Sequence, residues 1–265
     1  MGDFCYYKNF KIHYKQHGAG DAVVLLHGFT ESLNIWNDFS ERLSVSYHVI
    51  SIDLPGHGLS ECVSQVHTME MMAGCVKNVL DTIGVKLSVI IGHSMGGYVA
   101  LAFADIYPAM MKGLGLFHSY ALADTPEKFK NRMRTNNLIK NNLFNFLGEF
   151  IPSLFTLENQ LKYVSEINDM VRESEKMSPE AVLAANSGMA ERPDRTHVLN
   201  NAPYPVLFIA GKLDVRLPLA VLLEQIGMPS DSTALLMGDV AHMGYMEAKD
   251  KTYYAVKTFV DKCYR

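Results

Sequence analysis

The sequence lacks the features that mark several large classes of protein. Its four cysteines are scattered, with no Cys-x-x-Cys pair and no metal-ligand spacing to histidines, so we expect neither a disulfide framework nor a metal site. It has no apolar run long enough to span a membrane, and no basic and then apolar segment near its start that would indicate a signal peptide. Scattered thiols fit a reducing compartment, and we therefore expect a cytoplasmic protein.

Neither positive nor negative charge dominates the sequence. The net charge is −4 and there is no run of Lys and Arg, so nucleic acid is not an expected partner. What the sequence does have is a hydrophobic content of 48% over 265 residues, enough to bury a sizeable core in one large α/β domain.

Strand and helix patterns alternate along most of the chain. An aromatic-rich opening predicts a β-hairpin over residues 4–7 and 10–16. Short apolar runs predict buried strands at 22–26, 47–52, 87–91, 112–118, 205–210 and 232–237. Amphipathic or helix-favouring segments predict helices at 32–43, 68–83, 95–107, 218–226 and 246–263. This alternation favours an α/β fold with a mostly parallel twisted sheet and helices on both faces.

The alternation stops between residues 119 and 187. No convincing strand occurs there, and the pattern instead predicts amphipathic helices at 126–138, 142–150, 157–171 and 179–187. The interruption far exceeds an ordinary connection between a strand and a helix. We therefore expect a helical cap insertion at 119–187, within an α/β core made of residues 1–118 and 188–265.

A sharp turn between a strand and a helix carries the strongest chemical signal. Gly92-His93-Ser94-Met95-Gly96 matches the G-x-S-x-G pattern, directly after the apolar run at 87–91 and before a helix. Glycines two residues before and after the serine allow the turn to be tight enough to expose its hydroxyl. The helix that follows directs its N-terminal N–H groups toward an oxyanion forming beside the serine.

Two further reactive residues follow later strands. Their order in the chain is the one expected for a hydrolase whose nucleophilic serine lies on a turn of this kind. Ser94, Asp214 and His242 each come just after a predicted strand, at the sheet edge where ligands bind. The expected roles are nucleophile, orienting acid and general base. Asp124 is an alternative acid. We expect the backbone N–H groups of Met95 and Phe29 to form the oxyanion hole.

The chain resembles the α/β-hydrolase fold superfamily, in the form that carries a helical cap. The matching segments cover nearly the whole chain outside the cap: 27–29 (HGF), 53–60 (DLPGHGLS), 92–97 (GHSMGG), 211–214 (GKLD) and 241–242 (AH). The resemblance implies an eight-stranded sheet with one antiparallel strand near its start, and no cofactor. A serine at position 94 is unlike the haloalkane dehalogenases and soluble epoxide hydrolases of this superfamily, which use a carboxylate there.

These expectations favour a serine hydrolase of the carboxylesterase type. The substrate would be a small or medium ester, and apolar residues of the cap suggest an apolar portion. We expect Gly28, His93 and His118 beside the substrate pocket.

Two alternatives stay open. The same residues serve C–C bond hydrolases and pyruvate-eliminating lyases of similar fold, which need basic groups in the cap. The cap has such groups, although we expect them on an exposed face: Lys128, Lys130, Arg132 and Arg134. The other alternative is a non-catalytic ligand-binding protein on a hydrolase-like scaffold. The sequence does not specify an oligomeric state.

Overall fold

A computed structural model describes residues 2–265 and shows one eight-stranded sheet. Its strand order is β1-β2-β4-β3-β5-β6-β7-β8. The strands are β1 (Asp3–Tyr7), β2 (Phe10–His17), β3 (Ala22–Leu26), β4 (His48–Ile52), β5 (Ser88–His93), β6 (Met111–Phe117), β7 (Val206–Gly211) and β8 (Ser232–Met237). Strand β2 is antiparallel to both of its neighbours, and the remaining pairs are parallel. The mostly parallel sheet, with one antiparallel strand near its start, is confirmed.

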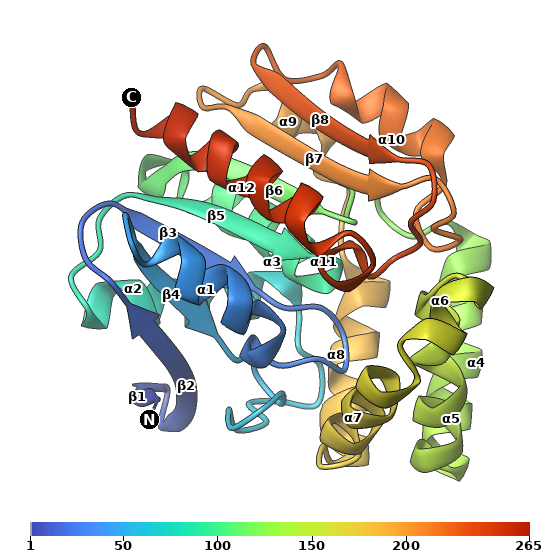
Figure 1. The fold of residues 1–265 in the computed structure, drawn as a ribbon. Coiled ribbons are helices and arrows are strands. Elements are labelled where there is room, and N and C mark those ends of the chain that lie inside the picture. The colour runs from blue at the N-terminus through green and yellow to red at the C-terminus, as the bar shows by residue number, and fades with distance from the viewer. Residues whose placement is uncertain (1) are drawn as a thin grey trace.

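Helices cover both faces of this sheet (Figure 1). Those of the alternating part are α1 (Asn37–Leu43), α2 (Met69–Thr82), α3 (Met95–Ile106), α10 (Leu219–Ile226), α11 (Gly244–Glu247) and α12 (Lys249–Cys263). In Figure 1, α1 and α12 lie in front of the sheet and α2 and α3 lie behind it. Strands β3, β5 and β7 are buried along their whole length, as expected for strands between two helical layers.

The opening hairpin shows how local sequence sets the geometry. Tyr7 pairs with Phe10, so Lys8 and Asn9 form a two-residue turn, and both have positive φ (48° and 75°). A turn of this kind matches the twist of the strands. Asn tolerates positive φ easily, whereas Lys adopts it at a cost.

The segment between β6 and β7 is helical and lies beyond the carboxyl ends of the central strands (Figure 1). It contains α4 (Pro126–Asn141), α5 (Leu143–Phe150), α6 (Leu157–Lys162), α7 (Val164–Ser174), α8 (Pro179–Glu191) and α9 (Thr196–Asn200). The prediction of a single helix at 157–171 is wrong, because the helix is interrupted at Tyr163 (ψ 31°). The division into core and cap stays a prediction, and its boundary at 187 falls inside α8.

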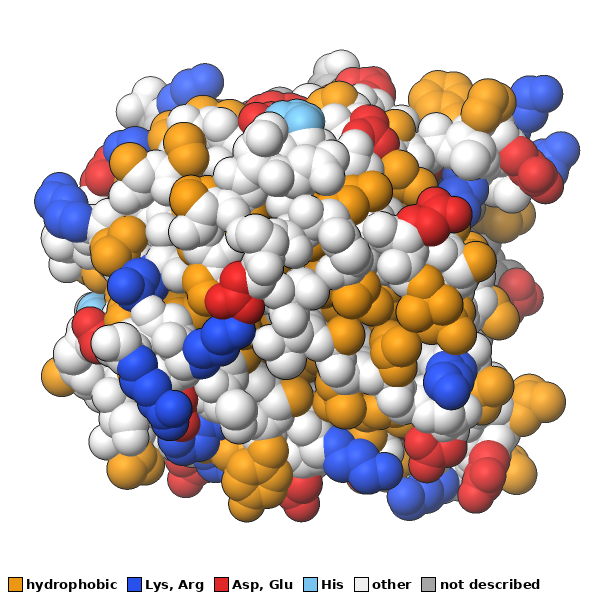
Figure 2. All heavy atoms as spheres, turned by 90° about the horizontal axis from the view of Figure 1, so that it is seen from above, with side chains coloured by type: hydrophobic (Ala, Val, Ile, Leu, Met, Phe, Trp, Pro, Cys, Tyr) orange, Lys and Arg blue, Asp and Glu red, His pale blue; other side chains and the backbone are white. Residues whose placement is uncertain are grey.

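The face of the molecule shown in Figure 2 has no single dominant charge. Around the face in Figure 2, acidic and basic side chains are interspersed with apolar ones. Within residues 2–265, no helix has the length and apolar character needed to cross a membrane.

Candidate active site

Ser94 occupies a strained turn between β5 and α3. Its φ of 49° and ψ of −114° lie outside the regions that L-residues favour, at a cost of about 1–3 kcal/mol. The two flanking glycines permit this turn. A Cβ on Gly92 would lie 2.2 Å from the carbonyl oxygen of Gly96, and one on Gly96 would lie 2.5 Å from that of Leu26. The Ser94 N–H donates to the carbonyl of Phe117 (2.9 Å), so the turn is also tied to β6.

Ser119 supports the turn from the other side, a contact that the sequence patterns did not predict. Its hydroxyl donates to the Ser94 carbonyl at 2.8 Å. A Cβ on Gly97 would come within 2.3 Å of that hydroxyl oxygen, so the first turn of α3 needs a glycine there. The structure therefore fixes the serine backbone and leaves its side chain facing a cavity.

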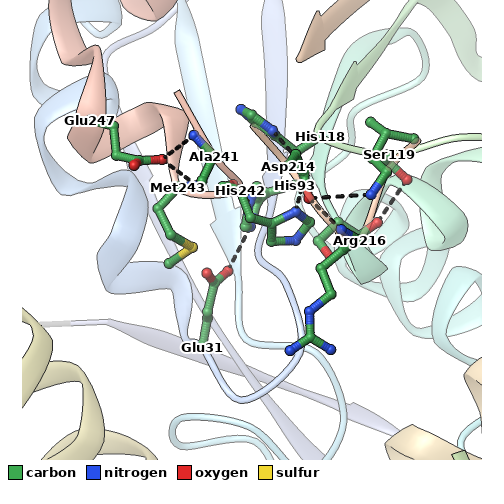
Figure 3. Close-up of polar contacts among 12 residues, drawn as sticks. Glu31, His93, His118, Ser119, Asp214, Arg216, Ala241, His242, Met243 and Glu247 are labelled. Atoms are coloured by element: carbon green, nitrogen blue, oxygen red, sulfur yellow. Dashed lines mark hydrogen bonds and ion pairs between the residues drawn. The ribbon is translucent and has the colours of Figure 1, made fainter. Parts of the chain in front are cut away.

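Asp214 and His242 form a buried pair after β7 and β8 (Figure 3). His242 donates from Nδ1 to Asp214 Oδ2 at 2.7 Å. The other carboxylate oxygen, Oδ1, accepts the N–H groups of Arg216 (2.8 Å) and Leu217 (3.2 Å). Burial alone would raise the pKa of Asp214, but the interactions with both His242 and His118 hold it well below its ordinary value. The carboxylate therefore stays ionised and keeps a proton on His242 Nδ1, which leaves Nε2 as the base.

His118 is a second histidine on the same carboxylate. Its Nδ1 lies 3.2 Å from Asp214 Oδ2, and its backbone has a positive φ of 49°. Burial lowers its pKa to about 4, so it is neutral at pH 7. Ligand atoms of His118, Asp214 and His242 lie within 4.8 Å of one another. Both rings donate to one carboxylate oxygen, however, so this arrangement is a hydrogen-bonded group rather than a set of free metal ligands.

A glutamate that the sequence patterns did not single out holds the loop carrying His242. Glu247 Oε2 accepts the N–H groups of Ala241 (2.9 Å) and Met243 (3.1 Å), the two neighbours of His242 (Figure 3). The N–H of His242 itself donates to the carbonyl of Leu154 in the helical insertion (3.0 Å). The position of the ring therefore depends on both α11 and the insertion.

A second buried histidine–carboxylate pair lies behind the first. His93 donates from Nδ1 to Glu31 Oε2 (2.9 Å) and from Nε2 to the carbonyl oxygen of His242 (3.0 Å). A carbonyl and a carboxylate can only accept, so both ring nitrogens carry protons and His93 is a cation. Burial would lower the pKa of His93, but the charge of Glu31 raises it. Glu31 also accepts from Gly28 N–H (2.6 Å) and from the Tyr245 hydroxyl (3.0 Å).

The expected oxyanion donors lie on the two elements that flank Ser94. Met95 is the first residue of α3, so its N–H has no acceptor within the helix. Phe29 lies in the loop after β3, and its side chain lines the same cavity as Ser94. Gly28 also lies next to Ser94, because a Cβ on Gly28 would be 3.2 Å from the Cβ of Ser94. The Gly28 N–H, however, is already bound to Glu31.

Ser94 and His242 line one cavity of about 580 Å³. The hydrogen bonds among residues 2–265 include none between the two side chains, as is common when no substrate is present. Of the three residues expected beside the pocket, His118 lines this cavity, whereas Gly28 and His93 are not among its lining residues. Apolar residues of the insertion also contribute to the wall: Leu138, Phe146, Phe150 and Leu154.

The expectation that the basic residues of α4 form an exposed face is half wrong. Lys130 and Arg134 are exposed, but Lys128 and Arg132 line the cavity. They are one helical turn apart and therefore share a face. Asp124, the alternative acid, forms ion pairs with Arg132 and Arg192, while His242 is bonded to Asp214.

Comparisons with known proteins agree with this fold. A family model described as the alpha/beta hydrolase fold matches residues 21–249. A 2-hydroxy-6-oxononadienedioate/2-hydroxy-6-oxononatrienedioate hydrolase from Paraburkholderia phymatum is 30% identical over 83% of this chain and 81% of its own length. A thermophilic esterase from Thermogutta terrifontis, solved with malate bound, is 30% identical with a TM-score of 0.90, over 97% of this chain and 95% of the esterase. The enol-lactonase from Burkholderia xenovorans has a TM-score of 0.90 at 20% identity, over 98% of this chain and 100% of the lactonase, which is a likeness of fold alone.

Proposed function

The chain belongs to the alpha/beta hydrolase fold family, and we propose that it is a serine hydrolase that cleaves carboxylic esters through an acyl-enzyme. One observation carries this proposal. A hydroxyl on a strained turn, at Ser94, and a histidine oriented by a buried carboxylate, at His242, line the same cavity. The similar esterase from Thermogutta terrifontis supports the ester as the substrate class.

The proposed reaction has two halves. In the first, Ser94 Oγ adds to the acyl carbon while His242 Nε2 accepts the hydroxyl proton, which it then gives to the departing alcohol oxygen. In the second, His242 activates a water that attacks the acyl-enzyme and returns the proton to Ser94. Asp214 maintains the tautomer of His242 and stabilises the imidazolium that forms in each half.

The charge that develops on the substrate oxygen needs its own donors. We assign this role to the N–H groups of Met95 and Phe29, which flank Ser94 on α3 and on the loop after β3. Removing one donor from a comparable site costs about 3 kcal/mol of transition-state stabilisation. The positive end of the α3 dipole acts in the same direction.

The helices between β6 and β7 are proposed to act as a cap over this cavity. Apolar side chains of this segment contribute to its wall, and the Leu154 carbonyl accepts the N–H of His242. The cap would therefore shape the acyl or alcohol site and also help to hold the base.

C–C bond hydrolysis is a second candidate, favoured by the cationic side chains of Lys128 and Arg132 in the cavity. The relative from Paraburkholderia phymatum is named for a dienedioate substrate, which carries two carboxylates. The same serine and histidine would serve that reaction. Loss of absorbance from a 2-hydroxy-6-oxo-dienoate, compared between wild type and Ser94→Ala, tests this candidate directly.

The ester proposal is tested with p-nitrophenyl esters from acetate to octanoate. We expect turnover and labelling by a fluorophosphonate probe in the wild type, and loss of both in Ser94→Ala. Ser46→Ala is the matched control, because Ser46 is exposed and remote from the cavity lining, and it should behave as the wild type. Turnover that persists in Ser94→Ala, or its absence from the wild type, would refute the proposal.

A further inference from the structure

We infer that the preferred substrate carries a carboxylate, which Lys128 and Arg132 bind on the cap side of the cavity. This inference rests on the proposed function, because it concerns the same cavity. It adds a charged group to the apolar substrate portion expected from the sequence, since the apolar wall contributed by α5 covers only part of the lining.

The charges on this side of the cavity are unbalanced. Of the cationic side chains Lys128, Arg132 and Arg192, two pair with the carboxylate of Asp124: Arg192 at 2.8 Å, and also Arg132. Lys128 Nζ has no carboxylate partner among residues 2–265, and it donates instead to the Tyr120 hydroxyl at 2.8 Å. An additional anion would therefore be attracted to this group of residues.

Burial makes this excess of positive charge costly when no ligand is present. Arg192 is 5% exposed, and its Nε has no hydrogen-bond partner within the described part of the chain. Burial lowers the pKa of Lys128; Tyr98 and Asp124 raise it, whereas repulsion from Arg192 and Arg132 lowers it, and the net shift is downward. Buried charges of like sign are tolerated only when a compensating charge is nearby. A bound carboxylate would supply that charge.

The geometry favours a small, planar anion. Arg132 uses Nε for Asp124 and Nη1 for the Asn186 side-chain oxygen (3.2 Å), which leaves Nη2 without a hydrogen-bond partner in residues 2–265. Lys128 has further ammonium protons beyond the one given to Tyr120. One guanidinium nitrogen and one ammonium match the two oxygens of a carboxylate.

The cationic side chains on the cap side of the cavity are close enough to Ser94 for one substrate to reach both. Tyr98 follows Ser94 by four residues on α3, which corresponds to about 6 Å along the helix. The Tyr98 ring lies 4.0 Å from the guanidinium of Arg192 and packs edge-on against Tyr120 at 5.7 Å. One helical turn and one ring therefore separate the serine from the cationic side chains.

The remaining charged groups of the lining do not cancel this preference. Arg216 is a further cation, which donates to the Ser153 hydroxyl (2.9 Å) and lies over the Phe150 ring (4.8 Å). The only acidic lining residue other than Asp124, in the described chain, is Glu149, which is exposed to solvent. A carboxylate at Lys128 would therefore meet net positive charge.

A matched pair of esters tests the inference. Mono-p-nitrophenyl adipate carries a terminal carboxylate, and p-nitrophenyl hexanoate has an acyl chain of the same length without it. The rate measured with Ser94→Ala is subtracted as background. We expect the wild type to have a higher kcat/KM for the adipate than for the hexanoate. Lys128→Met should lower kcat/KM for the adipate about 10- to 100-fold more than for the hexanoate, mainly through KM, because a hydrogen bond to a charged group is lost. Lys130→Met, an exposed neighbour on the same helix, is the control and should retain the preference.

Two further measurements separate failure of the inference from failure of the proposed function. Lys128→Arg keeps the charge and should retain the preference for the adipate. Ser94→Ala should bind adipate in calorimetry more tightly than neutral adipamide, and the added Lys128→Met change should remove that difference. Ser94-dependent hydrolysis of both esters without preference would overturn the inference alone. Binding of adipate without any Ser94-dependent hydrolysis would overturn the proposed function alone.

Discussion

Glu31 connects three parts of the site, and replacing it with glutamine tests how much that connection contributes. Its carboxylate accepts from His93, from the Gly28 N–H and from the Tyr245 hydroxyl, all of them buried. A glutamine has one oxygen and one NH₂ group. Without the negative charge of the carboxylate, we expect His93 to lose the proton on Nδ1, which then becomes an acceptor. If the glutamine oxygen accepts from Gly28, it also faces this unprotonated nitrogen; if the NH₂ group donates to His93, Gly28 loses its acceptor.

The expected cost follows from that conflict. Breaking a buried ion pair by removing one partner costs about 3–5 kcal/mol, but His93 can release its proton and avoid part of this penalty. What remains is the cost of an unsatisfied buried group, about 1–3 kcal/mol. We therefore expect Glu31→Gln to lower the free energy of unfolding by about 1–3 kcal/mol. It should also lower kcat, because His93 no longer holds the His242 carbonyl firmly.

The cost should depend on pH. Burial would raise the pKa of Glu31, but the charge of His93 lowers it, so the Glu31 contribution is present above its unfolded value of about 4.5 and is lost as the pH falls. The pKa of His93 is raised in the folded protein, so its contribution is complete below about 6.5 and is lost as the pH rises through the folded value. The difference between wild type and variant should be largest between these two values.

Urea unfolding followed by the fluorescence of Trp36 measures this difference. Trp36 is the single tryptophan and is fully buried, so its emission should report on unfolding of the core. Glu41→Gln, at an exposed position on α1, is the matched control and should stay within about 0.5 kcal/mol of wild type. A Glu31→Gln variant as stable as this control at pH 5.5 would show that the pair does not stabilise the site.

Two other substitutions test the parts nearest the chemistry. Asp214→Asn should leave the fold intact but lower kcat about 10⁴-fold, because an amide does not maintain the tautomer of His242; steady-state hydrolysis shows this, and a loss below tenfold would contradict the role of Asp214. Gly92→Ala should lower Tm strongly, since the new Cβ would lie 2.2 Å from a carbonyl oxygen, whereas Gly148→Ala in α5 has open space and should raise the unfolding free energy by about 0.5–1 kcal/mol. Equal melting temperatures for these two variants would be inconsistent with the tight turn.

Much of the fold was predictable because local signals and tertiary packing agree. The apolar run at 22–26 is a strand buried on both faces, and Lys8-Asn9 forms the expected hairpin turn. The positions of Ser94, Asp214 and His242 follow from the topology, since residues after parallel strands meet at one edge of the sheet. The structure brings the last two into direct contact.

The features that the sequence did not predict depend on contacts between distant segments. Glu31 is paired with a histidine 62 residues away, through the adjacency of β3 and β5 rather than through any local motif. The helix break at Tyr163 involves neither proline nor glycine, so no residue there marks it. The four-residue spacing of Lys128 and Arg132 indicates a shared face, but only the packing of α4 determines that this face lines the cavity.

The central claim is that the Ser94 hydroxyl becomes acylated during turnover. Rapid mixing of the enzyme with p-nitrophenyl hexanoate, acid quenching and peptide mass spectrometry measure this most directly. We predict a hexanoyl group on the peptide that contains Ser94, formed with the first release of nitrophenolate and absent from Ser94→Ala. Turnover with no acyl adduct on this peptide, or with the adduct on another residue, would contradict it.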